Sequence, residues 1–485
     1  MCRRAALARR ARFHRLASIL VSSHRLGRTL SLRHIRFIAL GTAIGTGLFY
    51  GSSETIQAAG PAVLVAYLIA GCAAYAVMRA LGEMAVRHPV AGSFAQYTSR
   101  YVSPFLGFLT GWTFTFEMIV VAIADMTAAA GYMAMWYPDT PGWVWMVAAI
   151  ALICGLNLLR VKVYGELEFW FTLIKIVTII ALIVGGLGLI VFGVSLGGFD
   201  PGPHNLVDHL GGFAPFGVWG IVMSLGIVVF SFGGIETLGM TAGETADPAR
   251  SIPKAVNTVP VRILLFYVAT LAVILMLIPW TEIGSGESPF VQVFAKLGVP
   301  AAAHIINFVV LTAALSAMNS ITYAASRTMY GLAEQHHAPQ AFTRLSRSGV
   351  PIVPVAIVAA CCVVGLGAYL LIPDQLFLVV ASIATFATVL TWASILLAHH
   401  GMRREMARDG EPGTGFPMPL WPWTNVAALA FMAFVVVILA FTESGRMALV
   451  VGAIWVALLW AAYALLVGPE GRVRPELETR VLASR

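Results

Sequence analysis

The chain has 485 residues, of which 59% are hydrophobic and 11% are charged, and its mean hydropathy is +0.84. Soluble domains carry about 25% charged residues, so this composition excludes a soluble enzyme, a disordered protein and a disulfide-rich scaffold. A membrane helix needs ~20 apolar residues, so twelve spans would use about half of the chain. The composition therefore predicts an all-α, polytopic integral membrane protein.

Twelve apolar segments follow one another along the chain, separated by short loops that contain Pro, Gly or charged residues. We expect each segment to form one transmembrane helix. The predicted helices lie at 35–58, 61–86, 104–135, 143–159, 166–193, 217–241, 257–280, 301–330, 353–372, 375–398, 424–441 and 447–467.

The charged residues predict the orientation of these helices. With the N-terminus in the cytoplasm, 24 of the 31 Lys and Arg residues fall on the cytoplasmic side and two, Lys296 and Arg446, fall outside. The positive-inside rule then places both termini in the cytoplasm and the protein in the cytoplasmic (inner) membrane. The net charge of +8 thus reports topology and gives no support to nucleic-acid binding.

Residues 1–34 contain nine Arg and no acidic residue, and they lack a signal-peptide core. We expect a basic cytoplasmic tail on anionic lipid. Residues 1–24 are either a genuine tail or an over-extended start of the reading frame, and the sequence leaves both open.

Glycines interrupt the first and sixth segments. The first contains GTGLFYGS from Gly45 to Ser52, and the sixth contains FSFGGIE from Phe230 to Glu236. Close helix packing explains one glycine-rich span, but a corresponding pair points to an inverted-repeat transporter with its site at mid-membrane. Unwound backbone offers N–H groups to a carboxylate and carbonyls to an ammonium, which suits the zwitterionic head of an amino acid.

A few ionisable side chains lie deep in the predicted spans. Lys175 lies ten residues into the fifth span, and an intramembrane Lys indicates function unless it snorkels to the interface. Glu117 and Asp125 in the third span are about 80° apart around the helix, which allows them to face one cavity. We treat these three as candidates for proton coupling; the alternative for the acids is pairing with a buried Arg or with backbone.

Other features carry structural interpretations. Arg79 and Glu83 have the i, i+4 spacing of an ion pair and are expected to form an inner gate. Phe230 beside the sixth-span break is a candidate lid over a bound ligand. The sequence has no phosphate-binding loop, Ser-His-Asp pattern or metal-ligand spacing, so it predicts no cofactor, no metal and no enzymatic activity.

Long motifs resemble the bacterial amino acid permeases of the amino acid–polyamine–organocation superfamily, in the branch called the amino acid transporter family. The resemblance runs from about Arg25 to about Leu465. It rests on RHIRFIALGTAIGTGLFYGS (33–52), AAGPAVLVAYLIAG (58–71), VMRALGEMAV (77–86), YGELEFWFTLIK (164–175), TAGETADPARSIPKAV (241–256) and NFVVLTAALSAMNS (307–320).

The resemblance implies a leucine-transporter-type fold with five plus five inverted spans and two C-terminal helices. The core is then 35–398, followed by a cytoplasmic loop at 399–423, helices at 424–467 and a cytoplasmic tail at 468–485. It implies side-chain contacts to the substrate from spans one, three, six, eight and ten.

The family also implies roles for single residues. Thr46 and Gly47 would bind the substrate carboxylate, carbonyls near Ala43, Ile44, Phe230 and Ser231 would bind its ammonium, and Lys175 would occupy the place of a sodium ion. Phe230 matches an aromatic gate, and Glu236 matches a substrate-sensing polar position. The expected substrate-binding set is Ala43, Ile44, Gly45, Thr46, Gly47, Phe230, Ser231, Phe232, Gly233 and Glu236.

The sequence therefore predicts proton-coupled uptake of a neutral amino acid. ADMTAAAGYM (124–133) and FSFGGIETLGMTAGE (230–244) look most like proline-specific permeases, so proline is the first expected substrate, followed by aromatic or small neutral amino acids. The third span reads GWTFTFEMIV where the family has a Tyr-Trp-Phe run, which leaves the substrate open. An exchanger of amino acids or amines, and a sensor without transport, are the alternatives; the oligomeric state is not predicted.

Overall fold

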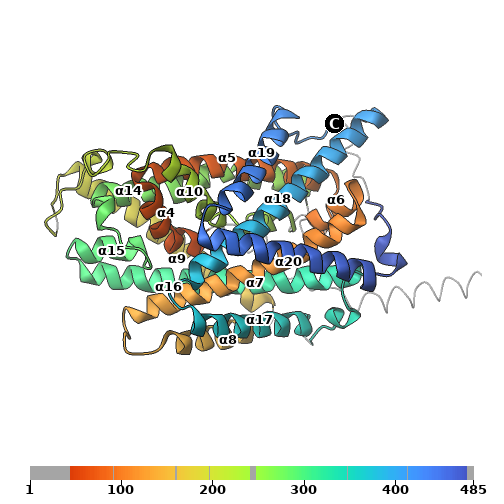
Figure 1. Cartoon of the computed structure of the whole chain (residues 1–485), viewed down its shortest axis with the longest axis horizontal. Coiled ribbons are helices and arrows are strands. Elements are labelled where there is room, and N and C mark those ends of the chain that lie inside the picture. Colours follow the sequence, from red (N-terminus) through yellow and green to blue (C-terminus); the bar gives the residue numbers. More distant parts are fainter. Residues whose placement is uncertain are drawn as a thin grey trace, which may run out of the picture.

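The structure, a computed structural model, describes residues 44–90, 92–158, 161–195, 197–240, 247–346, 348–411 and 413–477. Ala43 and the predicted basic tail lie outside the described residues. The described residues form helices and loops and no strand, with one isolated bridge between Leu345 and Pro351. Figure 1 shows the helices as an elongated bundle whose long members run side by side.

Within the described residues, eight helices are long and apolar enough to cross a membrane, and three shorter apolar helices accompany them. The eight are Gly51–Arg87, Pro104–Ala134, Glu166–Val191, Pro248–Leu277, Pro300–Glu334, Ile352–Leu371, Leu376–Asp409 and Glu443–Leu466. The shorter three are Gly142–Asn157, Gly217–Phe230 and Trp423–Leu439. The predicted all-α membrane class is confirmed.

In the first half of the chain, the described residues begin with a helix in pieces. In order, its helices are α3 (Thr46–Phe49), α4 (Gly51–Ala59), the 3₁₀ turn η1 (Gly60–Ala62), α5 (Val63–Arg87), α6 (Ser93–Tyr101), α7 (Pro104–Ala134), α8 (Gly142–Asn157), α9 (Val161–Val191), the turn η2 (Pro203–Leu206), α10 (Gly217–Phe230) and α11 (Thr237–Met240). Ser103 caps α7 through its side-chain oxygen, and Pro104 occupies the first turn, where no N–H is needed.

The second half continues with α12 (Pro248–Asn257), α13 (Val259–Arg262), the π-helix η4 (Ile263–Ala269) and α14 (Thr270–Leu277) in one rod. It then contains η5 (Trp280–Glu282), α15 (Pro289–Lys296), α16 (Pro300–Glu334), η6 (Gln340–Thr343), α17 (Ile352–Leu371), α18 (Leu376–Asp409), α19 (Trp423–Leu439), α20 (Glu443–Leu466) and η7 (Pro469–Arg472). Thr442 caps α20 with its hydroxyl.

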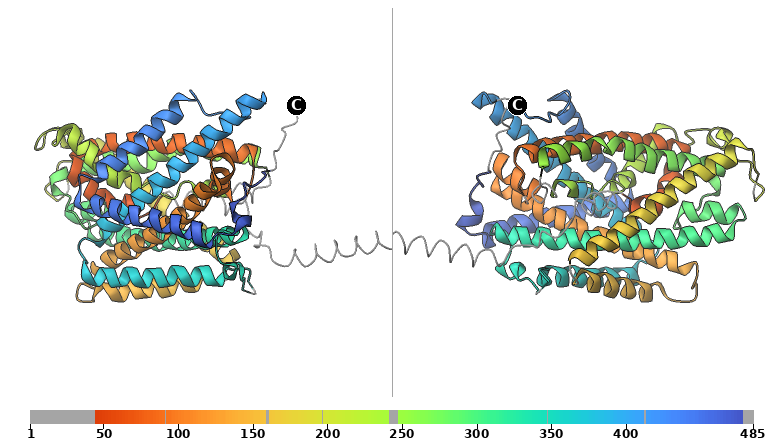
Figure 2. Two further views of the ribbon diagram at one scale, coloured as in Figure 1. Left: turned by 45° about the vertical axis from the view of Figure 1, so that its right-hand side comes forward. Right: turned by 180° about the vertical axis from the view of Figure 1, so that it is seen from behind.

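Helix α7 is the centre of the packing. It contacts α16 and α18 along much of its length, while α8 and α17 pair with each other on one side of the bundle (Figure 1). Seen from behind, α9 crosses the bundle obliquely against α16 and α14 (Figure 2). Side chains on α7 therefore reach the middle of the protein, where the broken segments meet.

The interruption predicted at FSFGGIE is present. Helix α10 ends at Phe230, residues 231–236 form turns, and α11 begins at Thr237. Gly234 has φ +89°, a left-handed conformation that suits glycine. The first segment is also interrupted, because Gly45 is extended before α3 and Tyr50 separates α3 from α4.

Two predicted boundaries are wrong. The seventh segment was predicted to begin at residue 257, but its helical rod begins at Pro248. Residues 399–409 were expected in a loop, but α18 continues through them to Asp409. This stretch, HHGMRREMARD, is polar yet rich in helix-forming Arg, Glu, Met and Ala, and Gly410 ends the helix with φ +66°. Hydropathy identifies only the apolar part of a helix. The polar end of α18 therefore lies outside the segment predicted from hydropathy.

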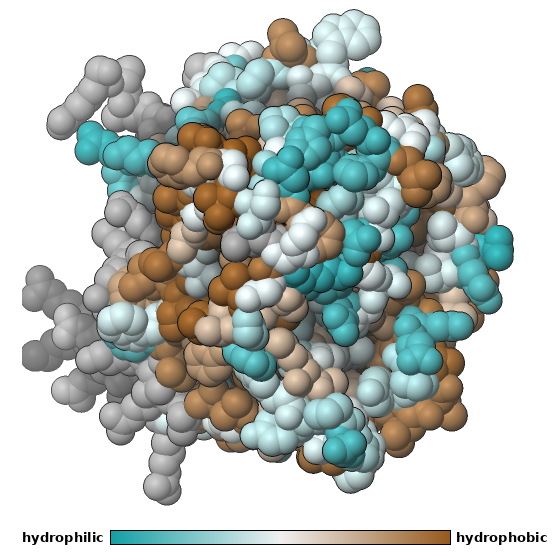
Figure 3. Space-filling view, turned by 90° about the vertical axis from the view of Figure 1, so that its left-hand side faces the viewer, coloured by the Kyte–Doolittle hydropathy of each residue, from teal (hydrophilic) through white to brown (hydrophobic). Residues whose placement is uncertain are grey.

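The end of the bundle near α14 and α15 is seen directly in Figure 3. In Figure 3, hydrophilic side chains gather in the upper centre of this end and on its right, and hydrophobic ones lie mainly over its left part and lower right. A bundle that spans a bilayer is expected to place polar residues over its ends and apolar residues around its sides.

Candidate functional site

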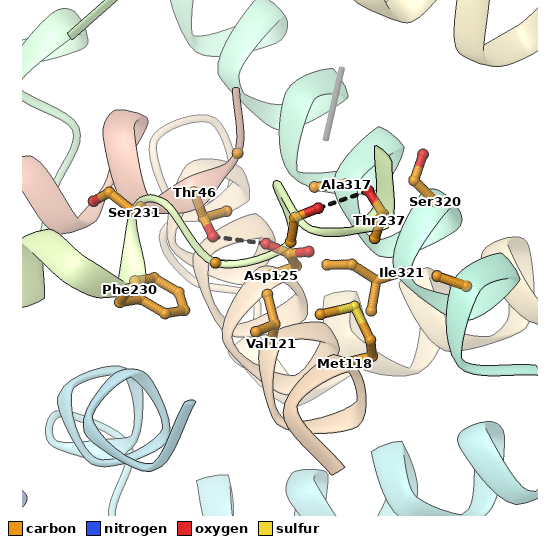
Figure 4. A pocket seen from close by; sticks show the side chains of 15 residues that line it. Thr46, Met118, Val121, Asp125, Phe230, Ser231, Thr237, Ala317, Ser320 and Ile321 are labelled. Carbon is orange, nitrogen blue, oxygen red and sulfur yellow. Dashed lines mark hydrogen bonds between the residues drawn. The ribbon is translucent and has the colours of Figure 1, made fainter. Parts of the chain in front are cut away.

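A cavity of about 520 Å³, including its open mouth, lies where the two broken segments meet α7 and α16 (Figure 4). Six of the predicted substrate-binding residues line it: Gly45, Thr46, Gly47, Phe230, Ser231 and Gly233. Ile44 and Phe232 are buried beside it but are not among the lining residues, and Glu236 lies behind it. The structure thus brings together segments that are about 180 residues apart.

Asp125 is the only acidic side chain among the described lining residues. Thr46 Oγ1 donates a hydrogen bond of 2.6 Å to Asp125 Oδ1, which ties the first segment to α7. The second oxygen, Oδ2, is buried and has no hydrogen-bond partner among the described residues. A buried carboxylate oxygen without a donor is costly, so this atom is suited to receive a donor from a ligand.

The two broken segments touch at Gly47 and Ser231. A Cβ on Gly47 would lie 2.5 Å from Ser231 Cα, so only glycine permits this approach. Tyr267 donates a 2.8 Å hydrogen bond to the Ser231 carbonyl, and the Tyr67 hydroxyl lies 3.3 Å from Ser231 Oγ. Two tyrosines therefore hold the break in place from outside the cavity.

One face of α16 forms the opposite wall, which the sequence reasoning placed in span eight without naming residues. This face consists of Ala317, Ser320, Ile321 and Ala324, whose spacing of three and four residues puts them on one side of the helix. Met118, Val121, Gly234 and Thr237 complete the lining. The expected contribution of span ten is wrong for the described lining, because the 233–234 backbone lies between α18 and the cavity.

Lys175 lies in a buried polar cluster behind Asp125. It is fully buried, and the carboxylates of Glu168 and Asp125 both act on it electrostatically. Glu168 is also fully buried, and Ser316 Oγ lies 2.9 and 3.0 Å from its two oxygens. Glu168 is not among the predicted site residues. It could have been found as an acid seven residues before Lys175, two turns away on the same helix face.

Glu117 and Asp125 do not face one cavity, although they share α7. Thr388 Oγ1 donates to Glu117 Oε1 at 2.7 Å, and Glu117 also interacts with Glu236. Asp125, in contrast, points into the cavity toward Thr46. The 80° between them is enough to place them on opposite sides of the broken sixth segment.

The prediction that Arg79 and Glu83 pair with each other is wrong, because each has other partners. Glu83 instead lies 2.9 Å from both Arg403 Nε and His399 Nε2, on α18. Arg79 donates to Asn257 and to the Pro417 carbonyl. Residues 413–422, before α19, contact α5 and supply partners that local helix spacing cannot reveal.

Comparisons with known proteins agree with this architecture. A family model described as amino acid permease matches residues 34–468. The chain is 47% identical to an uncharacterized amino acid permease, YtnA, of Bacillus subtilis over 90% of this chain and 94% of the relative. It is 43% identical to the amino-acid permease AapA of B. subtilis (90% and 95% covered) and 44% identical to the aromatic amino acid transport protein AroP of Escherichia coli (90% and 95%).

A solved structure shows the same fold. It is the crystal structure of the Eremococcus coleocola manganese transporter in complex with an aromatic bis-isothiourea substituted compound. The TM-score is 0.57 at 12% identity, with 91% of this chain and 94% of that chain covered. At this identity the likeness concerns the fold alone.

Proposed function

The chain belongs to the amino acid permease family, and we propose that it is a secondary active transporter that takes up a neutral amino acid together with a proton. The family makes it a membrane transporter rather than an enzyme. The observation that carries the proposal is Asp125 Oδ2, a buried carboxylate oxygen that lacks a donor and faces the cavity between the broken segments.

The backbone around the cavity suits a zwitterion. The substrate carboxylate would accept from the backbone N–H groups near Thr46 and Gly47, and its ammonium would donate to Asp125 Oδ2 and to carbonyls near Ile44, Phe230 and Ser231. Ala43 stays in this set as a prediction from the sequence. Glu236 would act from behind the cavity, through the 233–234 backbone.

The side-chain part of the cavity favours a neutral substrate. Met118, Val121, Phe230 and Ile321 are apolar, and no Lys, Arg or Glu is among the described lining residues. Proline remains the first candidate substrate, because segments 124–133 and 230–244 of this chain resemble proline-specific permeases. The relative named as an aromatic amino acid transport protein supports aromatic substrates as the next candidates.

Proton coupling is supported by the buried cluster beside the cavity. Lys175 between Asp125 and Glu168 could pass a proton to Asp125 when the substrate ammonium leaves. Glu117 is the third candidate, on the other side of the broken segment.

We also propose the finer architecture: twelve spans, with ten of them in a five-plus-five inverted repeat and both termini cytoplasmic in the inner membrane. The contacts that support it join equivalent elements of the two halves. Helix α7 packs on α16, α8 packs on α17, and α3 contacts α10. In such a repeat, alternating access arises when one group of helices rocks against the other.

An exchanger and a sensor remain the alternatives. An obligate exchanger would show no uptake into empty vesicles under a proton gradient but would show counterflow. A sensor would bind an amino acid without accumulating it.

The test is uptake of radiolabelled proline into vesicles that contain the purified protein, with an imposed inward proton gradient. Each of the twenty amino acids is then added as a competitor. We expect accumulation that a proton ionophore abolishes and competition confined to neutral amino acids. Absence of uptake and competition for proline, with uptake of another neutral amino acid, would refute only the proline assignment; absence of any transport would refute the function.

A further inference from the structure

Two glutamates meet behind the wall of the cavity. Glu117 of α7 and Glu236 at the end of the broken sixth segment are both fully buried. The two carboxyl groups lie close enough to act on each other, and Glu236 is the charged group that acts most strongly on Glu117. A hydrogen bond between two carboxyl groups requires a proton on one of them.

The remaining donors come from less than two turns of α18. Thr388 and Thr391 hydroxyls donate to the two Glu117 oxygens at 2.7 and 3.4 Å. Trp392 Nε1 donates to Glu236 Oε2 at 3.0 Å. These neutral groups supply hydrogen bonds but no positive charge, so they cannot compensate two negative charges in contact.

In the part of the chain that the structure describes, neither glutamate has a cationic partner: no Lys, Arg or His forms an ion pair with Glu117 or Glu236. Charged groups of the surrounding helices have other surroundings: Asp125 is bonded to Thr46, Arg79 to Asn257, Glu83 contacts Arg403 and His399, and Arg100 pairs with Glu405. Lys175 interacts with Glu168 and Asp125, Arg327 lies over Tyr323, and Glu443 and Arg446 are exposed. Arg262 lines a separate pocket beside Ile235 and Leu238 and is not among the groups that act most strongly on either glutamate.

The pair is separated from the cavity only by backbone. Gly233 and Gly234 line the cavity, and a Cβ on Gly233 would lie 3.3 Å from Glu117 Oε1 and 3.1 Å from Thr388 Oγ1. The Gly234 N–H lies 3.3 Å from Glu236 Oε1. A change in the contact between the two glutamates therefore acts directly on the backbone that lines the cavity.

We propose that Glu117 and Glu236 hold one proton between them and that this shared proton fastens the broken sixth segment to α7 and α18. One carboxyl carries the proton and donates to the other, which stays ionised. When the proton leaves to water, two adjacent carboxylates repel each other and the 231–236 segment is released. The release of the 231–236 segment during transport rests on the proposed function. The presence of a shared proton does not depend on that function.

Infrared spectroscopy tests the shared proton without any substrate. The full-length protein in lipid vesicles at neutral pH is compared with Glu117→Gln, Glu236→Gln and the control Glu282→Gln, which removes an exposed acid paired with Lys296. We expect a C=O band of a protonated carboxylic acid that both buried substitutions shift or remove and the control leaves unchanged. Absence of the band, or a band that responds to only one of the two substitutions, overturns the proposal.

Counterflow at several pH values tests whether the shared proton holds the 231–236 segment to α7 and α18. Glutamine can donate to the remaining carboxylate and so keeps the contact without a proton. We expect wild-type counterflow to change with pH about tenfold per unit above the apparent pKa, as for one titrating proton, and Glu117→Gln and Glu236→Gln to lose this dependence. A wild-type pH profile in both variants overturns the fastening, whereas absence of counterflow in the wild type contradicts the proposed function instead.

Discussion

Thr46 and Asp125 join two segments of the chain that a substrate must approach together. The 2.6 Å hydrogen bond from Thr46 Oγ1 to Asp125 Oδ1 fixes the carboxylate so that its other oxygen faces the cavity. The bond therefore orients Asp125 and couples the broken first segment to α7, the helix at the centre of the packing. Any movement of the first segment is expected to move the carboxylate as well.

Asp125→Asn is expected to weaken substrate binding. The substitution keeps the shape but removes the charge that would accept from an ammonium, and charge-assisted hydrogen bonds contribute about 1.5–3 kcal/mol. We expect the Kd, measured by scintillation proximity with labelled substrate, to rise by about tenfold to a hundredfold. Asp139→Asn, in the loop before α8, is the matched control and should leave the Kd unchanged; an unchanged Kd for Asp125→Asn would refute the binding role.

Gly47→Ala is expected to abolish transport. The new Cβ would meet Ser231 Cα at 2.5 Å, and backbone cannot yield as a flexible side chain does. Gly155→Ala is the control, since a Cβ there has no atom within 4 Å. Uptake in vesicles at equal protein amounts measures both variants, and normal uptake by Gly47→Ala would contradict the close approach of the two segments.

Lys175→Met tests the buried cluster in two ways. If Lys175 couples the proton, uptake loses its pH dependence; unchanged dependence would remove Lys175 from the mechanism. The substitution also leaves Glu168 without its cation, and breaking a buried pair costs about 3–5 kcal/mol. The double variant Lys175→Met with Glu168→Gln should recover part of the thermal stability that the single variant loses. The same low stability in both variants would contradict the pairing.

Glu83→Gln is expected to destabilise the junction of α5, α18 and the loop at 413–422. Glu83 is fully buried, and it receives hydrogen bonds from Thr414 Oγ1 at 2.6 Å and Met418 N at 2.8 Å besides its contact with Arg403. Loss of its charge should lower the free energy of unfolding by about 3 kcal/mol, read from the melting temperature in detergent.

The control for Glu83→Gln is Glu405→Gln, which breaks the more exposed pair with Arg100. Exposed pairs contribute about 1 kcal/mol or less. Equal effects of the two substitutions would show that burial does not set the strength of the Glu83 pair.

His337 is expected to make stability depend on pH. Burial lowers the pKa of His337, whose Nε2 lies 2.8 Å from the Gly471 carbonyl and whose Nδ1 is buried without a partner among the described residues. Below pH of about 6.5, the unfolded chain binds a proton that the folded protein does not, so the free energy of unfolding falls as the pH falls.

His337→Gln should reduce this loss, because Gln can still donate to Gly471 and does not titrate. Melting temperatures at pH 7 and pH 5 check the prediction, with His336→Gln, an exposed neighbour, as the control. A pH dependence that is the same in all three proteins would assign the effect to other groups.

Parts of the site could be predicted because their signals are local. Gly45, Gly47 and the Gly233–Gly234 pair mark breaks, since glycine in a membrane helix has a packing or conformational reason. Asp125, Lys175 and Glu117 are conspicuous because a charge inside a membrane span is costly. The wall on α16 has no such signal, because Ala317, Ser320, Ile321 and Ala324 are ordinary residues of a packed helix.

The sequence by itself determined the membrane class, the positions of most helices, the break after Phe230 and the set of buried charges. These follow from hydropathy, glycine and charge, which act on neighbouring residues of one helix. Only the tertiary structure decided which charges meet: Glu83 with Arg403, Lys175 with Glu168 and Asp125, and Glu117 with Glu236. Apart from Lys175 and Glu168, which share α9, the partners lie far apart in the chain, and their contact depends on how α5, α7, α9, α18 and the 231–236 segment pack.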